Sequence, residues 1–221
     1  MTKRLASLAL LLCHFQPLPA QTAATVTTDE AAHRYRISAE GTQVVIRVFR
    51  AGALERLGHN HIISATQIDG TVVVDGAGGR SSFVLRVPVA TLVVDDPELR
   101  RQAGDGFAGT PSAADIEGTR DNLLGPRVLD AAAYPLITVR GSTEGETSSS
   151  AASVRFEVKQ EGVEKIVPIE ALVTDQAISV SGELELSHEE LGLRPFRALL
   201  GAIRVAELIE VSFEIRAVRE E

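Results

Sequence analysis

The chain has 221 residues, and its 30 acidic against 22 basic side chains give a formal net charge of −8. This negative field repels polyanions and so argues against nucleic-acid binding. The single cysteine excludes a disulfide framework within one chain. The absence of Trp leaves few stacking platforms for sugars or bases.

The first residues predict export. A basic start (1–4) precedes an apolar run (5–15), and Ala20 and Ala24 offer small residues for cleavage. This layout is typical of a secretory signal peptide, and the run is shorter than the roughly 20 apolar residues of a membrane-spanning helix. We therefore interpret 1–24 as a signal peptide and expect a periplasmic or secreted protein.

The rest of the chain predicts one domain. We expect a flexible leader over 25–32 and a folded domain over 33–219, with no later transmembrane segment. A lipid anchor on Cys13 is disfavoured, because Leu12 occupies the position where acylated cysteines follow a small residue.

Apolar residues alternate with polar ones in the first half of the domain, which predicts β-strands. Such strands are expected at 33–38, 44–49 and 82–87, with two short extended pieces between 62 and 75.

The middle of the chain breaks this rhythm with a helical insertion at about 96–133. Asp96 and Pro97 predict the cap and first position of a short helix. A second helix is expected to begin after Ser112 and to end at Gly125-Pro126.

The strand pattern then resumes at a regular spacing. Strands are expected at 136–140, 154–159, 166–173, 178–186 and 208–218. About eight or nine short strands with short turns predict an all-β sandwich or an up-and-down barrel.

Three segments resemble the YceI-like family of bacterial periplasmic lipid-binding proteins. The first, 116–138, contains Thr-Arg-Asp-Asn-Leu-Leu, then Val-Leu-Asp, then Tyr-Pro-Leu-Ile-Thr. The second joins Leu-Gly-Leu at 191–193 and Pro-Phe at 195–196 to the last strand. The third is Gly-His-Asn-His at 58–61, with Ile-Asp-Gly at 68–70 behind it.

The resemblance implies an eight-stranded antiparallel, lipocalin-like β-barrel with a helical insertion. It also implies that the lumen holds an apolar chain such as a polyisoprenoid or isoprenoid quinone, with no required cofactor. The sequence departs from the family pattern at Val139, where relatives have an aromatic residue, and at Leu123, where many have a histidine.

Two histidines, His59 and His61, stand two residues apart and would share one face of a strand. With His188 from a later loop they form an alternative metal site. Two histidines are too few for a closed zinc site, so we expect no metal and favour backbone or head-group hydrogen bonds for these rings.

The candidate ligand-binding residues are His59, His61, Arg120, Tyr134, Phe156 and Phe213. Arg120 either pairs with Asp121 or reaches a ligand head group. Tyr134 precedes Pro135 and is expected to fix the entry into a strand, while its phenol can line the pocket.

No nucleophile elbow, phosphate loop or dinucleotide fingerprint is present, so we expect a binding protein and no enzyme. The adjacent carboxylates Asp95-Asp96 and Glu189-Glu190 are interpreted as solvated loop charge. The leading hypothesis is a carrier or sequestering protein for an isoprenoid-like lipid. The alternatives are a periplasmic metal-binding protein and an interaction barrel whose core its own side chains fill.

Overall fold

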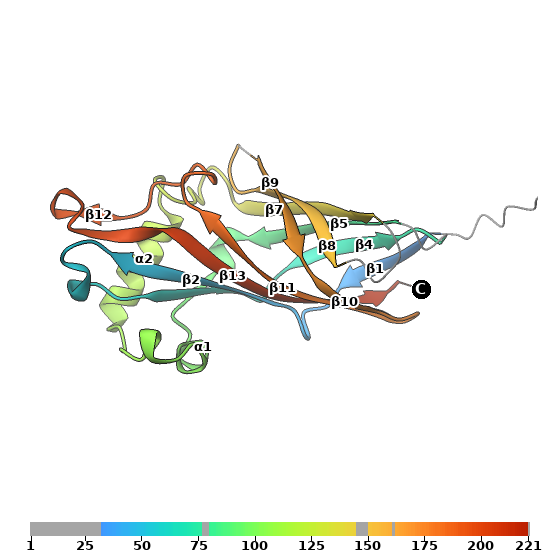
Figure 1. Ribbon diagram of the computed structural model, residues 1–221, viewed down its shortest axis with the longest axis horizontal. Helices are drawn as coiled ribbons and strands as arrows, with labels where there is room; N and C mark the ends of the chain where they lie inside the picture. The colour runs from blue at the N-terminus through green and yellow to red at the C-terminus, as the bar shows by residue number, and fades with distance from the viewer. Residues whose placement is uncertain (1–31, 77–79, 145–149, 161, 221) are drawn as a thin grey trace, which may run out of the picture.

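The computed structural model describes residues 32–76, 80–144, 150–160 and 162–220. The predicted signal peptide lies outside these residues, as does the predicted leader up to residue 31. The described residues form an elongated antiparallel sheet of 13 strands with a few helices near one end (Figure 1).

The strands vary in length from two residues to 17. In chain order they are β1 (His33–Ile37), β2 (Gln43–Ala51), β3 (His61–Ala65), β4 (Asp69–Val74), β5 (Arg80–Pro88), β6 (Val93–Val94), β7 (Leu136–Glu144), β8 (Ala151–Glu157), β9 (Gly162–Pro168), β10 (Glu170–Val173), β11 (Ala177–Ser187), β12 (Arg197–Ala198) and β13 (Ile203–Arg219). The helices are α1 (Pro97–Gln102) and α2 (Ala113–Leu124), with 3-10 turns η1 (Glu55–Leu57), η2 (Val89–Thr91), η3 (Asp105–Phe107) and η4 (Leu199–Gly201).

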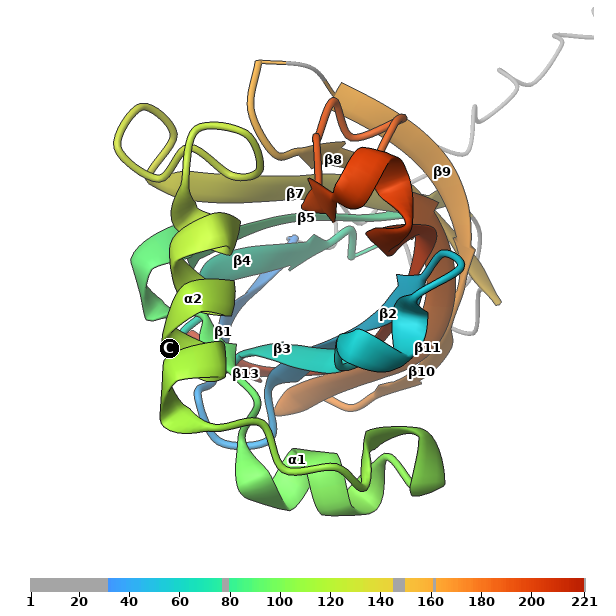
Figure 2. The same ribbon diagram turned by 90° about the vertical axis from the view of Figure 1, so that its left-hand side faces the viewer.

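The longest strand, β13, organises the sheet. Along one edge it pairs first with β2 and then, near its end, with β1. Along the other edge it pairs with β11 from Leu208 to Val218. The sheet continues from β1 through β4, β5, β7, β8 and β9, and from β2 through β3 to β6. Strand twist lets so long a ladder curl round on itself (Figure 2).

The expectation of antiparallel all-β structure is confirmed, but the eight-stranded closed barrel is not. The sheet has 13 strands, and among the described residues no ladder joins β9 to β11. Instead β9 pairs with β8 and ends at Pro168, and after Ile169 the chain continues as β10, which pairs with β11. Proline lacks the N–H that a ladder needs, so it interrupts what the sequence predicts as one strand over 166–173.

The two helices of the insertion begin at the cap residues that the sequence predicts, Asp96 and Ser112. The Asp96 side chain accepts hydrogen bonds from the N–H groups of Glu98 and Leu99, at the start of α1. Ser112 and Asp115 form a reciprocal capping box at the start of α2. Within the described ranges, no helix is long and apolar enough to cross a membrane.

Candidate functional site

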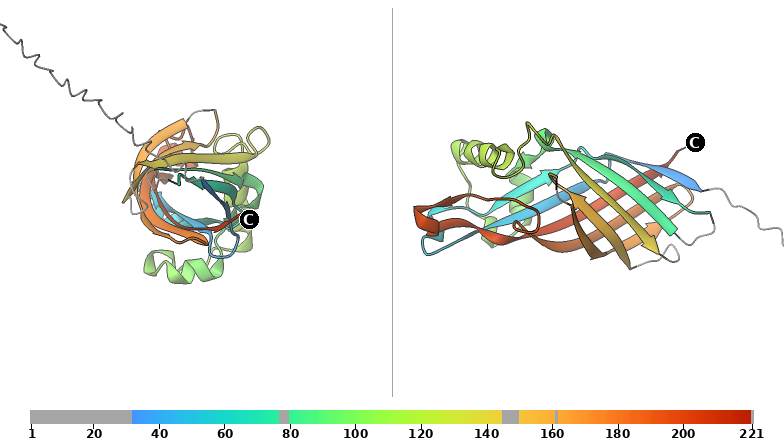
Figure 3. Two further views of the ribbon diagram at one scale, coloured as in Figure 1. Left: turned by 90° about the vertical axis from the view of Figure 1, so that its right-hand side faces the viewer. Right: turned by 90° about the horizontal axis from the view of Figure 1, so that it is seen from above.

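The curled sheet encloses a cavity of about 290 Å³. Its lining comes from almost every strand, with Leu123 of α2 and Val128 and Leu129 after α2 at one end. Among the described lining residues only Arg80, Ser81, Thr143 and His188 are polar. The views along the long axis show how the sheet curls, from one end (Figure 2) and from the other (Figure 3).

Period-two alternation creates the apolar lining. In β13, Ile209, Val211, Phe213 and Ile215 face the cavity, while the residues between them do not line it. Because successive strand side chains point to opposite faces, each strand supplies one apolar row to the interior. The cavity is therefore a direct consequence of the sequence pattern combined with the curl of the sheet.

Two glycines lie beneath aromatic rings in the cavity wall. Gly141 is paired across the sheet with Phe83, and Gly182 with Phe213. A Cβ atom at Gly141 would lie 2.3 Å from the Phe83 Cζ atom, and one at Gly182 would lie 2.6 Å from the Phe213 Cζ atom. The missing side chains thus allow both rings to lie close against the wall, so the glycines keep space free in the lumen.

The polar lining residues lie at opposite ends of the cavity. At the end where β5 begins and β7 finishes, the Ser81 and Thr143 hydroxyl oxygens are 2.7 Å apart, beside Arg80. At the other end His188 follows β11; it is buried, and its Nδ1 is 3.0 Å from the carbonyl oxygen of Glu207. Between these ends the lining residues that the structure describes offer no polar side chain to a ligand, which suits a long apolar chain.

The structure separates the sequence-predicted binding residues into two groups. Phe156 and Phe213 line the cavity. His59, His61, Arg120 and Tyr134 do not. Whether any of them binds a ligand stays a prediction.

Arg120 has a different set of partners from those expected. Its guanidinium donates to the carbonyl oxygens of Leu92 and, at 2.7 Å, Ala90. These bonds attach α2 to the segment that follows β5. Tyr134 is half-buried, directly before Pro135 and the first residue of β7.

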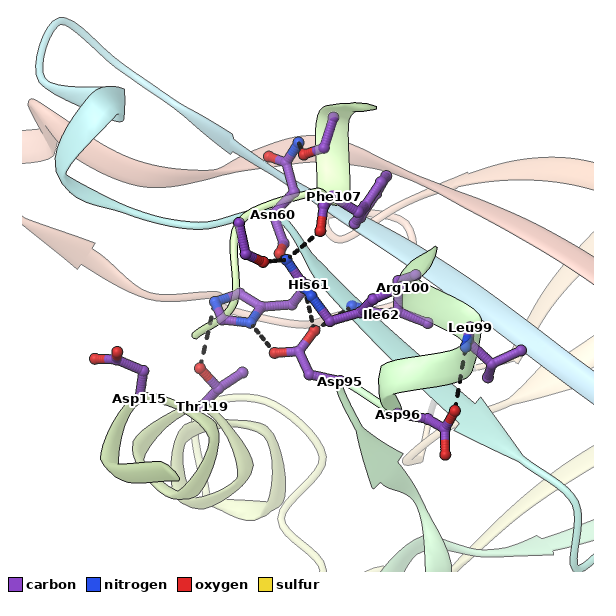
Figure 4. A network of polar contacts seen from close by, with 12 residues as sticks. Asn60, His61, Ile62, Asp95, Asp96, Leu99, Arg100, Phe107, Asp115 and Thr119 are labelled. Carbon is purple, nitrogen blue, oxygen red and sulfur yellow. Dashed lines mark hydrogen bonds and ion pairs between the residues drawn. The ribbon is translucent and has the colours of Figure 1, made fainter. Parts of the chain in front are cut away.

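The sequence interpretation of Asp95 as solvated loop charge is wrong. Asp95 is buried and has a positive φ of 56°. Its carboxylate accepts hydrogen bonds from Arg100 Nη1 at 2.5 Å and from the Ile62 N–H at 2.9 Å, and lies 2.6 Å from His61 Nδ1 (Figure 4). Burial alone would raise the pKa of Asp95. The hydrogen bonds from His61, Ile62 and Arg100 outweigh it, so the pKa lies below its ordinary value.

Arg100 extends this Asp95 network to two loops. Its Nη1 also donates to the Asn60 carbonyl oxygen at 2.8 Å, and its Nη2 donates to the carbonyl oxygens of Phe107 and Gly109. On the other side, His61 Nε2 lies 3.4 Å from the Thr119 hydroxyl of α2. The network thus connects β3, α1, α2 and the η3 loop. Asp95 stands directly after the apolar pair Val93-Val94, and this was the signal that could have indicated its burial.

The histidines proposed as alternative metal ligands do not come together. The rings of His59 and His61 lie 6.2 Å apart outside the cavity, whereas His188 lines it. In the part of the chain that the structure describes, no group of three or more His, Cys, Asp or Glu side chains has a metal-binding arrangement. The geometry therefore gives the metal hypothesis no support.

The fold and the cavity define an antiparallel β protein that wraps an apolar interior. A family model described as the YceI-like domain matches residues 35–217. The chain belongs to the YceI-like family, and this confirms the resemblance found in the sequence.

Solved structures agree with this family at the level of the fold. The Burkholderia cenocepacia protein BcnA is similar at a TM-score of 0.57 and 15% identity, over 81% of this chain and 98% of that one. A mutant CJ YCEI protein is similar at a TM-score of 0.51 and 9% identity, over 72% of this chain and 85% of that one. No curated protein matches the sequence.

Proposed function

We propose that the protein binds one isoprenoid-like apolar chain, a polyisoprenoid or an isoprenoid quinone, in its cavity and carries or sequesters it in the periplasm. The observation that supports this most strongly is the cavity lining, in which polar side chains occur at the two ends alone among the described residues. The membership of the YceI-like family and the export signal expected at 1–24 agree with it.

The physical basis of binding is burial. A polyprenyl chain makes no hydrogen bonds, and each Å² of its apolar surface removed from water contributes roughly 25 cal/mol. Residues such as Ile46, Leu85 and Val180 supply branched aliphatic walls of this kind. A polar head group would find hydrogen-bond partners at an end of the cavity, at Ser81 and Thr143 or at His188. This function requires no catalytic group.

The first experiment identifies the natural occupant. Protein purified under native conditions without detergent is extracted with organic solvent, and the extract is analysed by mass spectrometry. We expect an isoprenoid chain in stoichiometric amount. Repeated recovery of empty protein that also fails to bind a fluorescent prenyl probe would contradict the proposal.

A pair of variants at neighbouring positions tests whether the cavity is the binding site. Ala171 of β10 lines the cavity, whereas Leu172 is 68% exposed on the outer face. Ala171→Phe adds a ring inside the lumen, and we expect it to weaken prenyl-probe binding about 10-fold or more. Leu172→Phe adds a ring outside and is the matched control, with unchanged affinity. Equal binding of the probe by both variants would mean that the probe binds outside the cavity.

A further inference from the structure

The turns η1 and η4 lie at the same end of the molecule as β12 (Figure 1), and several exposed apolar side chains belong to these turns or stand next to them in the sequence. We name this group of side chains the leucine tip and define it by Leu54, Leu57, Phe196, Leu199 and Leu200. Leu200 is fully exposed, and Leu57 and Leu199 are exposed by 69% and 63%. The Leu54 N–H donates to the Ala202 carbonyl oxygen at 2.9 Å, so two loops almost 150 positions apart lie side by side.

The backbone of the tip holds its leucines in an unfavourable conformation. Leu199 and Leu200 have φ angles of 48° and 56°, in the left-handed region that leucine rarely adopts. Neither residue gains burial in return. Strain without a packing benefit within the molecule is typical of segments shaped for contact with a partner.

The charge around the tip has the opposite sign to that of the chain. The segments 50–57 and 196–204 contain four arginines, Arg50, Arg56, Arg197 and Arg204, and one acidic residue, Glu55. All four arginines are exposed, and none forms an ion pair with another described residue.

Two of these arginines face each other. Arg197 and Arg204 stand directly opposite across the β12–β13 pair. Like charges in this position repel each other and destabilise the hairpin. An anion bound between them would remove this repulsion.

We propose that the leucine tip docks onto an anionic lipid bilayer, with the leucines below the head groups and the arginines on lipid phosphates. Apolar side chains beside basic ones are the combination that binds a peripheral protein to such a surface. A second copy of the chain fits less well, because a twofold contact would bring one arginine cluster against the other.

The position of the tip connects it with the cavity. The η1 and η4 loops lie across the end of the sheet from α2 (Figure 2), at the end of the cavity that His188 lines. Docking through the tip would therefore bring this end of the cavity close to the bilayer. This consequence rests on the proposed lipid-binding function, whereas the docking itself does not.

Vesicle co-sedimentation tests the proposal. We expect the protein to sediment with vesicles of phosphatidylcholine and phosphatidylglycerol, less with phosphatidylcholine alone, and less at high salt. The variant Leu199→Asn/Leu200→Asn removes the apolar side chains and keeps residues that tolerate positive φ, so folding is preserved. It should weaken sedimentation about 10-fold, as should Arg56→Ser/Arg197→Ser.

The control is Leu172→Asn, which removes from β10, away from the tip, a leucine that is 68% exposed; it should sediment like the unaltered protein. Equal sedimentation by all variants, or no sedimentation of the unaltered protein, would overturn the proposal. Loss of a dimer in the tip variants, seen by analytical ultracentrifugation, would overturn it in favour of a second copy. Prenyl-probe binding without vesicles should be unchanged in the tip variants, so failure of docking and failure of the cavity proposal are distinguishable.

Discussion

The cavity and the Asp95 network are two interiors of one molecule with opposite chemistry. The cavity presents aliphatic walls and free space, with few side chains that could form hydrogen bonds or ion pairs with a ligand. In the network, the Asp95 carboxylate is surrounded by an arginine, a histidine and a backbone N–H. A space without directional partners suits a flexible apolar guest, whereas a saturated polar cluster fixes one arrangement of loops. We infer that the cavity serves binding and that the network maintains the shape of the adjoining end.

The largest effect is expected from breaking the network. Asp95→Asn removes the charge that balances Arg100, whose side chain is 8% exposed, and leaves a buried guanidinium without its counter-charge. Removing one partner of a buried ion pair costs about 3–5 kcal/mol. We expect a loss of that size in the free energy of unfolding, measured by urea denaturation.

The neighbouring carboxylate provides the control for that measurement. Asp96→Ala removes a helix cap at α1, for which a loss of about 1 kcal/mol is typical. Similar losses from both variants would mean that the buried pair has no special structural role.

A smaller effect is expected in the cavity wall. In Gly141→Ala the new Cβ atom would meet the Phe83 ring and, at 2.6 Å, the Ser153 carbonyl oxygen. Overpacking of this kind costs about 1–3 kcal/mol. The displaced ring should also reduce the affinity for a prenyl probe, measured by fluorescence titration.

Gly118→Ala is the matched control for Gly141→Ala. Gly118 lies in α2, and a Cβ atom there would have no atom within 4 Å apart from its chain neighbours and the backbone of its own helix. This variant should gain up to about 1 kcal/mol of stability because alanine favours helix, with probe binding unchanged. Unaltered stability and affinity in Gly141→Ala would refute the role assigned to the glycine.

The smallest expected effect is a change in how protein stability depends on pH below about pH 4. Because the pKa of Asp95 is lower in the folded than in the unfolded protein, its contribution to stability is complete above the unfolded pKa of about 3.9. That contribution is lost as the pH falls through the lower, folded pKa. We therefore expect the unaltered protein to lose stability below about pH 4 more steeply than Asp95→Asn, in thermal melts at a series of pH values. Parallel curves would contradict the assignment.

Much of the fold could be predicted from local sequence. The caps at Asp96 and Ser112 and all but one of the predicted strands follow from short-range preferences, and the structure has them. The sequence prediction missed the division between β9 and β10. A single apolar run does not reveal that the chain pairs with β8 up to Pro168 and with β11 after it. The candidate cavity was predictable in part, since Phe156 and Phe213 line it.

The polar features near the helices were harder to predict. Asp95 and Arg100 are five residues apart, but their burial depends on β3 and on the η3 loop packing around them. The leucine tip likewise needs two loops from distant parts of the chain. Charge and exposure at such sites depend on neighbours that local patterns do not contain.

By itself, the sequence determined which side chains of each strand share a face, where the helices begin, and the family to which the chain belongs. Period-two geometry and helix capping operate within a few residues, so they can be read locally. Only the tertiary structure decided that the apolar faces surround a space, that Gly141 and Gly182 lie beneath aromatic rings, and that Asp95 is buried. These features arise from strand register between distant segments, and register depends on the whole sheet.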